Sequence, residues 1–220
     1  MQLAPLLLSF QIAIVATSIA AVLGVSFGLL LSRKFPGRDV LDVLVTAPIV
    51  LPPTVLGYYV LVALGRKSAL GHAFESVTGS PIVFTKTGAI VAAVIGALPL
   101  TTKSARAALE GVDRTLILAA RTLGAGPLRA FLTVHLPLAS RGILAGMMLG
   151  FARSLGDFGV TLMVAGDIPG ETQTAALAIY DAIQAQRERD AAFMVGFLTL
   201  FGGAMLYLVA KLTGRADGRG

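Results

Sequence analysis

The sequence contains no cysteine and no tryptophan, only two histidines, and few charged residues of either sign. The missing cysteines exclude disulfide bonds and thiolate metal sites. Charged residues make up 14% of the 220 residues, whereas a soluble domain usually carries about 25%. Hydrophobic residues make up 55%, and the mean hydropathy is +0.82. This composition favours a protein that folds in lipid rather than in water.

Five charge-poor runs are candidates for membrane spans, for which roughly 20 apolar residues are needed. The predicted spans are residues 6–31, 43–65, 86–109, 138–165 and 191–211. The first run lacks a positively charged leader and is too long for a cleaved signal peptide, so we expect it to be retained. The sequence therefore predicts an all-α integral membrane protein with about five spans, forming a single transmembrane domain over residues 1–220.

Basic residues are divided unevenly between the two sides that these spans define. Twelve of the 18 Lys and Arg follow the first span, lie between the third and fourth, or follow the fifth, whereas five lie on the other side. The side richer in Lys and Arg is expected to be cytoplasmic, which predicts an outside N-terminus and an inside C-terminus. The same rule explains the net charge of +6 without a nucleic-acid partner. His72 and His135 are isolated and are interpreted as loop residues rather than metal ligands.

The cytoplasmic segment of about residues 113–137 has the pattern of a structured loop. Asp113 fits a helix N-cap, and Gly124 fits the stop of that helix. Pro127 fits the first position of a second, short helix, and Pro137 fits the start of the fourth span. Apolar residues recur at helical spacing after Asp113. They are Leu116, Ala119, Ala120 and Leu123.

Two interpretations of this predicted helix stay open. The amphipathic pattern is typical of a helix that rests on lipid headgroups. Leu118 favours a second interpretation, because it projects near Arg114 and Arg121, on the face opposite the apolar residues. A leucine in that position would be exposed to water unless it contacted another protein.

The segment resembles the signature of permeases from ATP-binding-cassette (ABC) importers: Glu-Ala-Ala, three residues, Gly, nine residues, Ile, any residue, Leu-Pro. The matching residues are Ala119, Ala120, Gly124, Leu136 and Pro137. Val134 replaces Ile, and Leu118 replaces Glu. The resemblance implies the type I (MetI-like) permease fold. It also implies that this loop docks on a cytoplasmic ATP-binding subunit, with Arg121 adding electrostatic complementarity.

The chain has no Gly-x4-Gly-Lys-Ser/Thr phosphate loop. The resemblance therefore implies that ATP and Mg²⁺ are bound by the partner ATPase, and that this chain is a non-catalytic permease subunit without a cofactor of its own.

The fourth span combines a small-residue stripe with two charges. Gly142, Gly146 and Gly150 share one helical sector with Arg153 and Asp157. Small residues let helices approach closely in lipid, and charges in a span usually face a bundle interior or a watery cavity. Two interpretations of the charges stay open: a self-neutralising i,i+4 pair near a membrane boundary, or a part of the gate or path. Ser154 and Gly156, which flank the charged residues, are candidates for the same path.

The second span contains Pro48, Pro52 and Pro53 within six residues. Proline breaks the helical hydrogen-bond ladder, and the freed carbonyls need partners inside a membrane. Either a static kink buried against its neighbours or a bend that lines the path would satisfy this requirement. We therefore include Pro52 and Pro53 among the candidate path residues.

Three further stretches resemble molybdate permeases: residues 152–159, 168–174 and 178–180. The resemblance implies a homodimer in the bacterial inner membrane, surrounded by lipid, that works with ATP-binding subunits and an external binding protein. Sulfate and tungstate permeases share much of the pattern and stay as alternatives. An ion-coupled secondary transporter is the alternative from another class, but internal repeats and a mid-membrane ion site are not evident. Nothing resembles the nucleophile–base pair of a membrane enzyme.

Overall fold

The computed structural model describes residues 3–214, and these are mostly helical. Four of their helices are long and apolar enough to cross a membrane. They are α1 (Leu3–Leu31), α5 (Lys86–Glu110), α8 (Leu136–Leu155) and α11 (Glu188–Gly214). A fifth crossing is formed if the bent pair α2 (Arg38–Val50) and α3 (Pro53–Leu64) is counted as one span.

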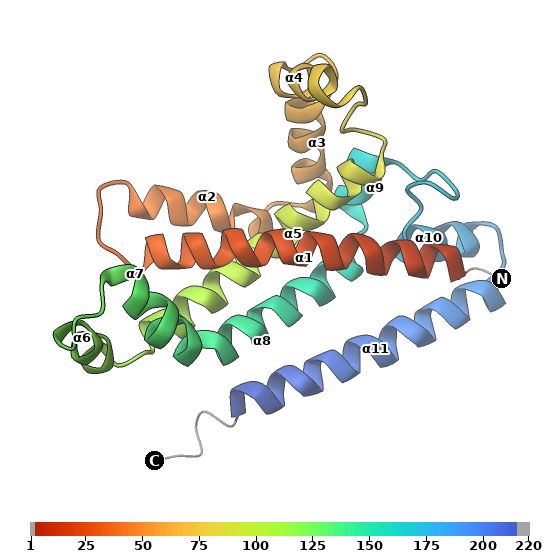
Figure 1. The fold of residues 1–220 in the computed structure, drawn as a ribbon. Helices are drawn as coiled ribbons and strands as arrows, with labels where there is room; N and C mark the ends of the chain where they lie inside the picture. The colour runs from red at the N-terminus through yellow and green to blue at the C-terminus, as the bar shows by residue number, and fades with distance from the viewer. Residues whose placement is uncertain (1–2, 215–220) are drawn as a thin grey trace.

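Shorter helices lie around this bundle (Figure 1). They are α4 (Ala69–Thr78), α6 (Arg114–Thr122), α7 (Pro127–Ala130), α9 (Gly159–Ala165) and α10 (Ala175–Gln184). One end of the bundle gathers α6, α7, the beginning of α2 and the last turns of α11, while α10 lies near the N-terminus at the other end (Figure 1). The first end carries the basic loops, so the positive-inside rule makes it the cytoplasmic end.

The central helix is α5, which packs against both α1 and α8, and those two helices also contact each other. Glycines allow this close approach. A Cβ atom at Gly24 of α1 would lie 2.5 Å from Oγ1 of Thr101, and one at Gly142 of α8 would lie 2.6 Å from Cβ of Ala108. A Cβ atom at Gly146 would collide with Ser104. The glycine stripe of the predicted fourth span is therefore a contact between α5 and α8.

Polar, aromatic and aliphatic contacts hold α1, α10 and α11 in place. Thr101 of α5 donates a hydrogen bond from Oγ1 to the carbonyl of Ala20 of α1 at 2.9 Å. The backbone N–H of Ala175, which begins α10, donates to Oγ of Ser9 at 2.7 Å. Phe10 of α1 and Phe201 of α11 form an edge-to-face pair with ring centroids 4.9 Å apart. The peripheral helix α11 thus attaches to the bundle through aromatic rings and through the buried Met194.

At the cytoplasmic end, α2 is joined to α5 by ion pairs. Lys103 Nζ lies 2.7 Å from Asp42 Oδ1, and Arg106 NH1 lies 3.0 Å from Asp42 Oδ2. Arg106 also reaches Glu110 through Nε at 2.9 Å. These charges compensate one another where the helices leave the membrane.

The predicted span over residues 43–65 contains the break that its prolines indicated, and two helices meet there at 119°. The break falls at Leu51 and Pro52. Pro52 and Pro53 have no N–H, so the carbonyls of Pro48 and Ile49 lose their donors four residues on. The chain turns instead of continuing, and α3 points away from the bundle with α4 at its tip (Figure 1).

The predicted span over 138–165 differs from the structure at both ends. α8 begins at Leu136 with Pro137 in its first turn, as predicted, but helical backbone already precedes it, so that a continuous helical stretch runs from Pro127 to Leu155. The stretch passes through a π-helical turn, η1 (Phe131–His135), in which the N–H of Leu136 donates to the carbonyl of Phe131. This wider turn accommodates the missing N–H of Pro137. At the other end, the chain breaks at Gly156 before α9 begins.

The glycine contacts predict that replacing glycine by alanine changes stability in opposite directions at two positions. We expect Gly146→Ala to lower the free energy of unfolding by about 1–3 kcal/mol, because the added methyl group must push α8 away from Ser104. Gly196→Ala in α11 meets no atom within 4 Å, so it should raise stability by about 0.5–1 kcal/mol through helix propensity. Thermal unfolding of the purified protein in detergent measures both. Equal effects of the two substitutions would contradict the packing described.

Candidate functional site

The helix α6 is fixed at both ends by local hydrogen bonds. Asp113 accepts a hydrogen bond at Oδ1 from the N–H of Thr115 at 2.8 Å, and this bond holds the pKa of the Asp113 carboxyl below its usual value. The cap is thus intact at neutral pH and is lost only as the pH falls through that lowered pKa. At the other end, Gly124 has φ of +88°, and Ala125 N–H donates to Ala120 at 3.0 Å. This Schellman motif confirms the predicted stop.

The two faces of α6 are arranged oppositely to those of a helix resting on lipid. Arg114, Ile117 and Arg121 line a cavity of about 550 Å³ against the end of α1, α7 and η1. The apolar residues Leu116 and Leu123 lie on the other side of the helix, and Leu123 is 88% exposed. A headgroup-bound helix turns its apolar face toward the bilayer and its basic face outward. The arrangement of the two faces therefore argues against a helix that rests on lipid headgroups, and the contact of Leu118 with another protein stays a prediction.

The second half of the permease signature lies beside the start of α6. A second cavity of about 590 Å³ is lined by Asp113 and Leu116 from the beginning of the loop and by Pro137 from the first turn of α8. Leu136 is half-buried beside Pro137. His135 Nε2 lies 2.9 Å from the carbonyl of Leu109, which ties this turn to the cytoplasmic end of α5. The residues of the first half of the signature, Ala119, Ala120 and Gly124, do not line this cavity.

Arg153 and Asp157 form the expected i,i+4 pair, with Arg153 NH1 2.8 Å from Asp157 Oδ1. The Asp157 side chain is 2% exposed, whereas that of Arg153 is 35% exposed. Asp157 Oδ2 accepts two hydrogen bonds from Thr161, from its N–H at 2.9 Å and from its Oγ1 at 2.6 Å. The carboxylate therefore binds an arginine with one oxygen and the first turn of α9 with the other.

Two breaks in the membrane helices lie side by side. A Cβ atom at Gly159 would lie 2.7 Å from Cβ of Pro53, and one at Gly57 would lie 2.6 Å from Cβ of Met163. Four residues further along α3 correspond to four residues further along α9 in these two contacts. The two helices therefore run parallel, and both begin at the same place. Both helix N-termini, which carry partial positive charge, thus lie next to the corner at Pro52.

The structure separates the candidate path residues into two groups. Pro52, Pro53 and Gly156 are exposed at the two breaks. Ser154 is buried and donates from Oγ to the carbonyl of Ala93 at 3.3 Å, so it belongs to the contact with α5. Arg153 belongs to neither group alone. Its guanidinium carbon and nitrogens approach Gly96 of α5.

Thr161 is the functional neighbour that the sequence reasoning did not single out. Its spacing of four residues after Asp157 was the available signal, because Thr and Asp often pair near a helix start. Within residues 3–214, the structure shows no group of three or more His, Asp or Glu side chains that could hold a metal ion.

Comparison with known proteins places this arrangement in a family. The model of the family described as "Binding-protein-dependent transport system inner membrane component" matches residues 5–216. The chain belongs to this family, and it is a multi-pass protein of the bacterial inner membrane.

Its relatives carry more specific names. The molybdenum transport system permease protein ModB of Escherichia coli strain K12 is 45% identical over 81% of this chain and 78% of its own length. The putative molybdenum transport system permease protein YvgM of Bacillus subtilis strain 168 is 37% identical over 94% of this chain and 92% of its own.

Solved structures confirm the fold of ABC-importer permeases. A chain of the MetNI methionine ABC transporter, in an inward-facing conformation, superposes with a TM-score of 0.66 at 19% identity and covers 94% of both chains. A chain of a bacterial alginate ABC transporter superposes with a TM-score of 0.69 at 12% identity, covering 98% of this chain and 81% of that one. At these identities the likeness concerns the fold alone.

The buried carboxylate predicts a clear order among variants. We expect Arg153→Ala to destabilise the protein by about 3 kcal/mol, because it leaves the buried Asp157 charge without its cation. The double variant Arg153→Ala/Asp157→Ala should lose less, since it removes the stranded charge. Thermal unfolding in detergent measures the difference.

The exposed pair of Arg187 and Asp181 supplies the control. Its atoms are 2.7 Å apart, but both side chains are nearly half exposed. Arg187→Ala should therefore change stability by at most about 1 kcal/mol. If the single and double variants at Arg153 and Asp157 unfolded at the same temperature, the pairing would carry no stability and the assignment would be wrong.

Proposed function

We propose that this chain is the transmembrane subunit of an ATP-driven importer that moves molybdate across the inner membrane. The observation that carries the proposal is its 45% identity, over 81% of the chain, to a molybdenum transport permease. In this proposal, a separate cytoplasmic subunit binds ATP and Mg²⁺ and hydrolyses the nucleotide. The permease itself binds no cofactor and has no catalytic residues, and an external binding protein delivers the substrate.

The loop of residues 113–137 transmits the motion of the ATPase. Its helix α6 carries apolar side chains that the rest of this chain leaves uncovered. Burying a leucine such as Leu123 in a cleft of the ATPase would contribute about 2 kcal/mol. Leu118 is 59% exposed on the flank of the same helix, which suits a residue that contacts the partner. Arg121 turns toward the cavity beneath α6, so we assign the docking surface to the leucines and alanines.

The stiffness of this loop supports the transmission of force. The Asp113 cap and the turn at Gly124 fix the helix at both ends. From Pro127 the helical stretch continues into the membrane as α8. A displacement of α6 by the ATPase therefore reaches the glycine contacts between α8 and α5, and through them the centre of the bundle.

The translocation path passes the two helix breaks. The carbonyls of Pro48 and Ile49 have no helical donor, and exposed backbone at membrane depth must face water or other protein. The N-termini of α3 and α9 lie beside this corner, and helix N-termini attract anions. Arg153 adds a cation that Asp157 neutralises. Weak attraction of this kind suits a dianion that must enter and also leave.

A second copy of the chain completes the path. Large apolar side chains along α3 are uncovered in the single chain, and they lie beside the break that needs protein or water around it. They are Val55, Tyr58, Tyr59 and Val62. A homodimer that covers these faces would enclose the two breaks between its subunits, with lipid on the outside.

The substrate assignment is tested by competition. Vesicles that hold the permease, its ATPase and its binding protein should take up molybdate only when ATP is present on the side of the membrane where the ATPase lies. Unlabelled tungstate should compete, because it is a tetrahedral dianion of nearly the same size as molybdate, whereas sulfate, a smaller tetrahedral dianion, should compete poorly. Competition by sulfate at equal concentration would assign the chain to sulfate transport. Uptake driven by an ion gradient without ATP would contradict the importer mechanism altogether.

The coupling role is tested at Gly124. We expect Gly124→Asp to abolish ATP-dependent uptake while the chain remains inserted, because an aspartate at φ of +88° is strained and its charge lies in the docking surface. Uptake and membrane content are measured together. Gly126→Asp is the control, since Gly126 is the N-cap of α7, with φ of −63° and open space around it. Aspartate is favoured there. Normal uptake by Gly124→Asp would refute the assigned role.

A further inference from the structure

The cavity beneath α6 collects three arginines that come from different parts of the chain. Arg33 follows the last turn of α1, and Arg114 and Arg121 project from one face of α6. The cavity has a volume of about 550 Å³, and none of its lining residues carries a carboxylate. It is therefore a concentrated positive site at the cytoplasmic end of the bundle.

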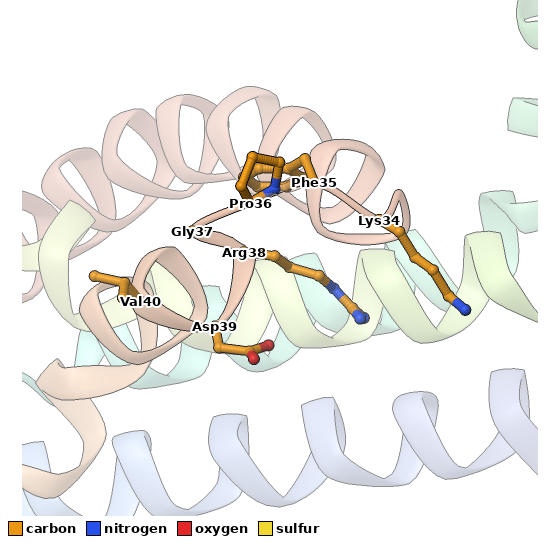
Figure 2. Close-up of a pocket in the computed structure, with 7 residues that line it drawn as sticks. All are labelled: Lys34, Phe35, Pro36, Gly37, Arg38, Asp39 and Val40. Carbon is orange, nitrogen blue, oxygen red and sulfur yellow. The ribbon is translucent and has the colours of Figure 1, made fainter.

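The three arginines of this cavity have no carboxylate partner. Within residues 3–214, none of their guanidinium groups forms an ion pair. Arg38, close by on the chain, is held differently. It donates from Nε to the carbonyl of Leu31 at 2.8 Å and lies 4.0 Å from Glu110. The cavity that it lines, of about 460 Å³, also carries Lys34 and the carboxylate of Asp39 (Figure 2), whereas the lining of the cavity beneath α6 has no carboxylate.

Apart from Ser32 and His135, the rest of the cavity wall is apolar. Leu29 contributes from α1, Ile117 from α6, Leu128 from α7 and Phe131 from η1. Leu29 lies within three residues of the end of α1, which is also the end of the first membrane span. The cavity thus offers arginines and hydrocarbon together at the boundary between membrane and cytoplasm.

We propose that this cavity binds the phosphate of an anionic phospholipid from the cytoplasmic leaflet. Guanidinium groups bind phosphate oxygens by charge-assisted hydrogen bonds, and basic pockets between membrane helices on this side suit acidic lipid headgroups. A free oxyanion offers the same chemistry. It would leave the apolar wall of Leu29, Ile117 and Leu128 in contact with water, whereas the glycerol and first methylenes of a lipid would cover it.

Such a lipid would act on the loop that we assign to the ATPase. Its phosphate would bind Arg33 at the end of α1 together with Arg114 and Arg121 of α6. In the structure, no hydrogen bond or ion pair joins these three side chains to one another. The lipid would therefore connect the end of α1 to α6. The basic face of α6 would then be held down while the apolar face remains outward. This inference concerns lipid binding and stands independently of which substrate is carried.

The test measures retained lipid by native mass spectrometry. The purified full-length chain, delipidated in detergent, is titrated with phosphatidylglycerol, with phosphatidylcholine and with inorganic phosphate. We expect one phosphatidylglycerol to bind in preference to phosphatidylcholine. Because a basic residue near an anionic lipid contributes about fivefold in affinity, Arg33→Gln and Arg114→Gln should each weaken binding about fivefold, and the double variant about 25-fold.

Arg129→Gln is the matched control. Arg129 belongs to α7, between the lining residues Leu128 and Ala130, but does not line the cavity. It should retain phosphatidylglycerol as the unmodified chain does. An equal loss in Arg129→Gln, or equal binding of phosphatidylcholine, would show general surface attraction and overturn the proposal.

Inorganic phosphate distinguishes the two sources of the anion. Displacement of phosphatidylglycerol by millimolar phosphate, with the same dependence on Arg33 and Arg114, would assign the cavity to a free oxyanion and reject the lipid. If the double variant does not fold, Arg33→Gln alone decides the matter, because Arg33 lies outside the helices.

Discussion

The close contact of α5 with α1 and α8 is the constraint on which the rest of the structure depends. Small residues on all three helices let their backbones meet, and in lipid this packing replaces the hydrophobic effect as the source of association. Thr101 of α5 contributes to both sides, since it meets Gly24 of α1 and Gly150 of α8. Every functional element is attached to this three-helix centre. The coupling loop enters it through α8, the ion pairs of α2 reach it through Asp42, and α9 packs on its outer half.

The direction of the side chains on α6 determines which partners the cytoplasmic loop can bind. In the isolated chain, the basic face of α6 lines a cavity without carboxylates, and the leucines on its other side are exposed. The two faces therefore lack partners of different chemistry. The outer face requires apolar protein surface, and the inner face requires anions. An ATPase and a lipid can meet these demands at the same time, because they approach the helix from opposite sides.

Much of this arrangement follows from sequence pattern, and the exceptions have local causes. Composition and charge placement predicted the all-helical membrane fold, and the Gly124 turn and Pro127 helix start follow from backbone chemistry that a few residues determine. The extent of each proline's effect depends on tertiary context. Pro137 is accommodated next to a π turn within a continuous helical stretch, whereas Pro52 and Pro53 together turn the chain by 119°. The residue type indicated a break or a helix start at these positions, but not how far the chain turns.

The roles of the site residues were harder to derive than their positions. Spacing showed that Arg153 and Asp157 share a helical sector, but it could not show that α8 ends between them or that Thr161 binds the second oxygen. The inward turn of Arg121 and the meeting of Pro53 with Gly159 are likewise contacts between distant segments. Such contacts depend on how helices cross, which hydropathy and periodicity do not encode.

The division of the Asp157 carboxylate between two partners has a consequence for how an anion passes. Oδ2 is committed to Thr161 and keeps the first turn of α9 wound. Oδ1 holds only Arg153, whose side chain is the more accessible of the two. On the proposed path, a dianion would bind the Arg153 guanidinium without unwinding α9, because Thr161 keeps its own oxygen of Asp157. The Asp157 carboxylate would then repel the dianion and pair with the arginine again, so this pair would both attract the anion and promote its release.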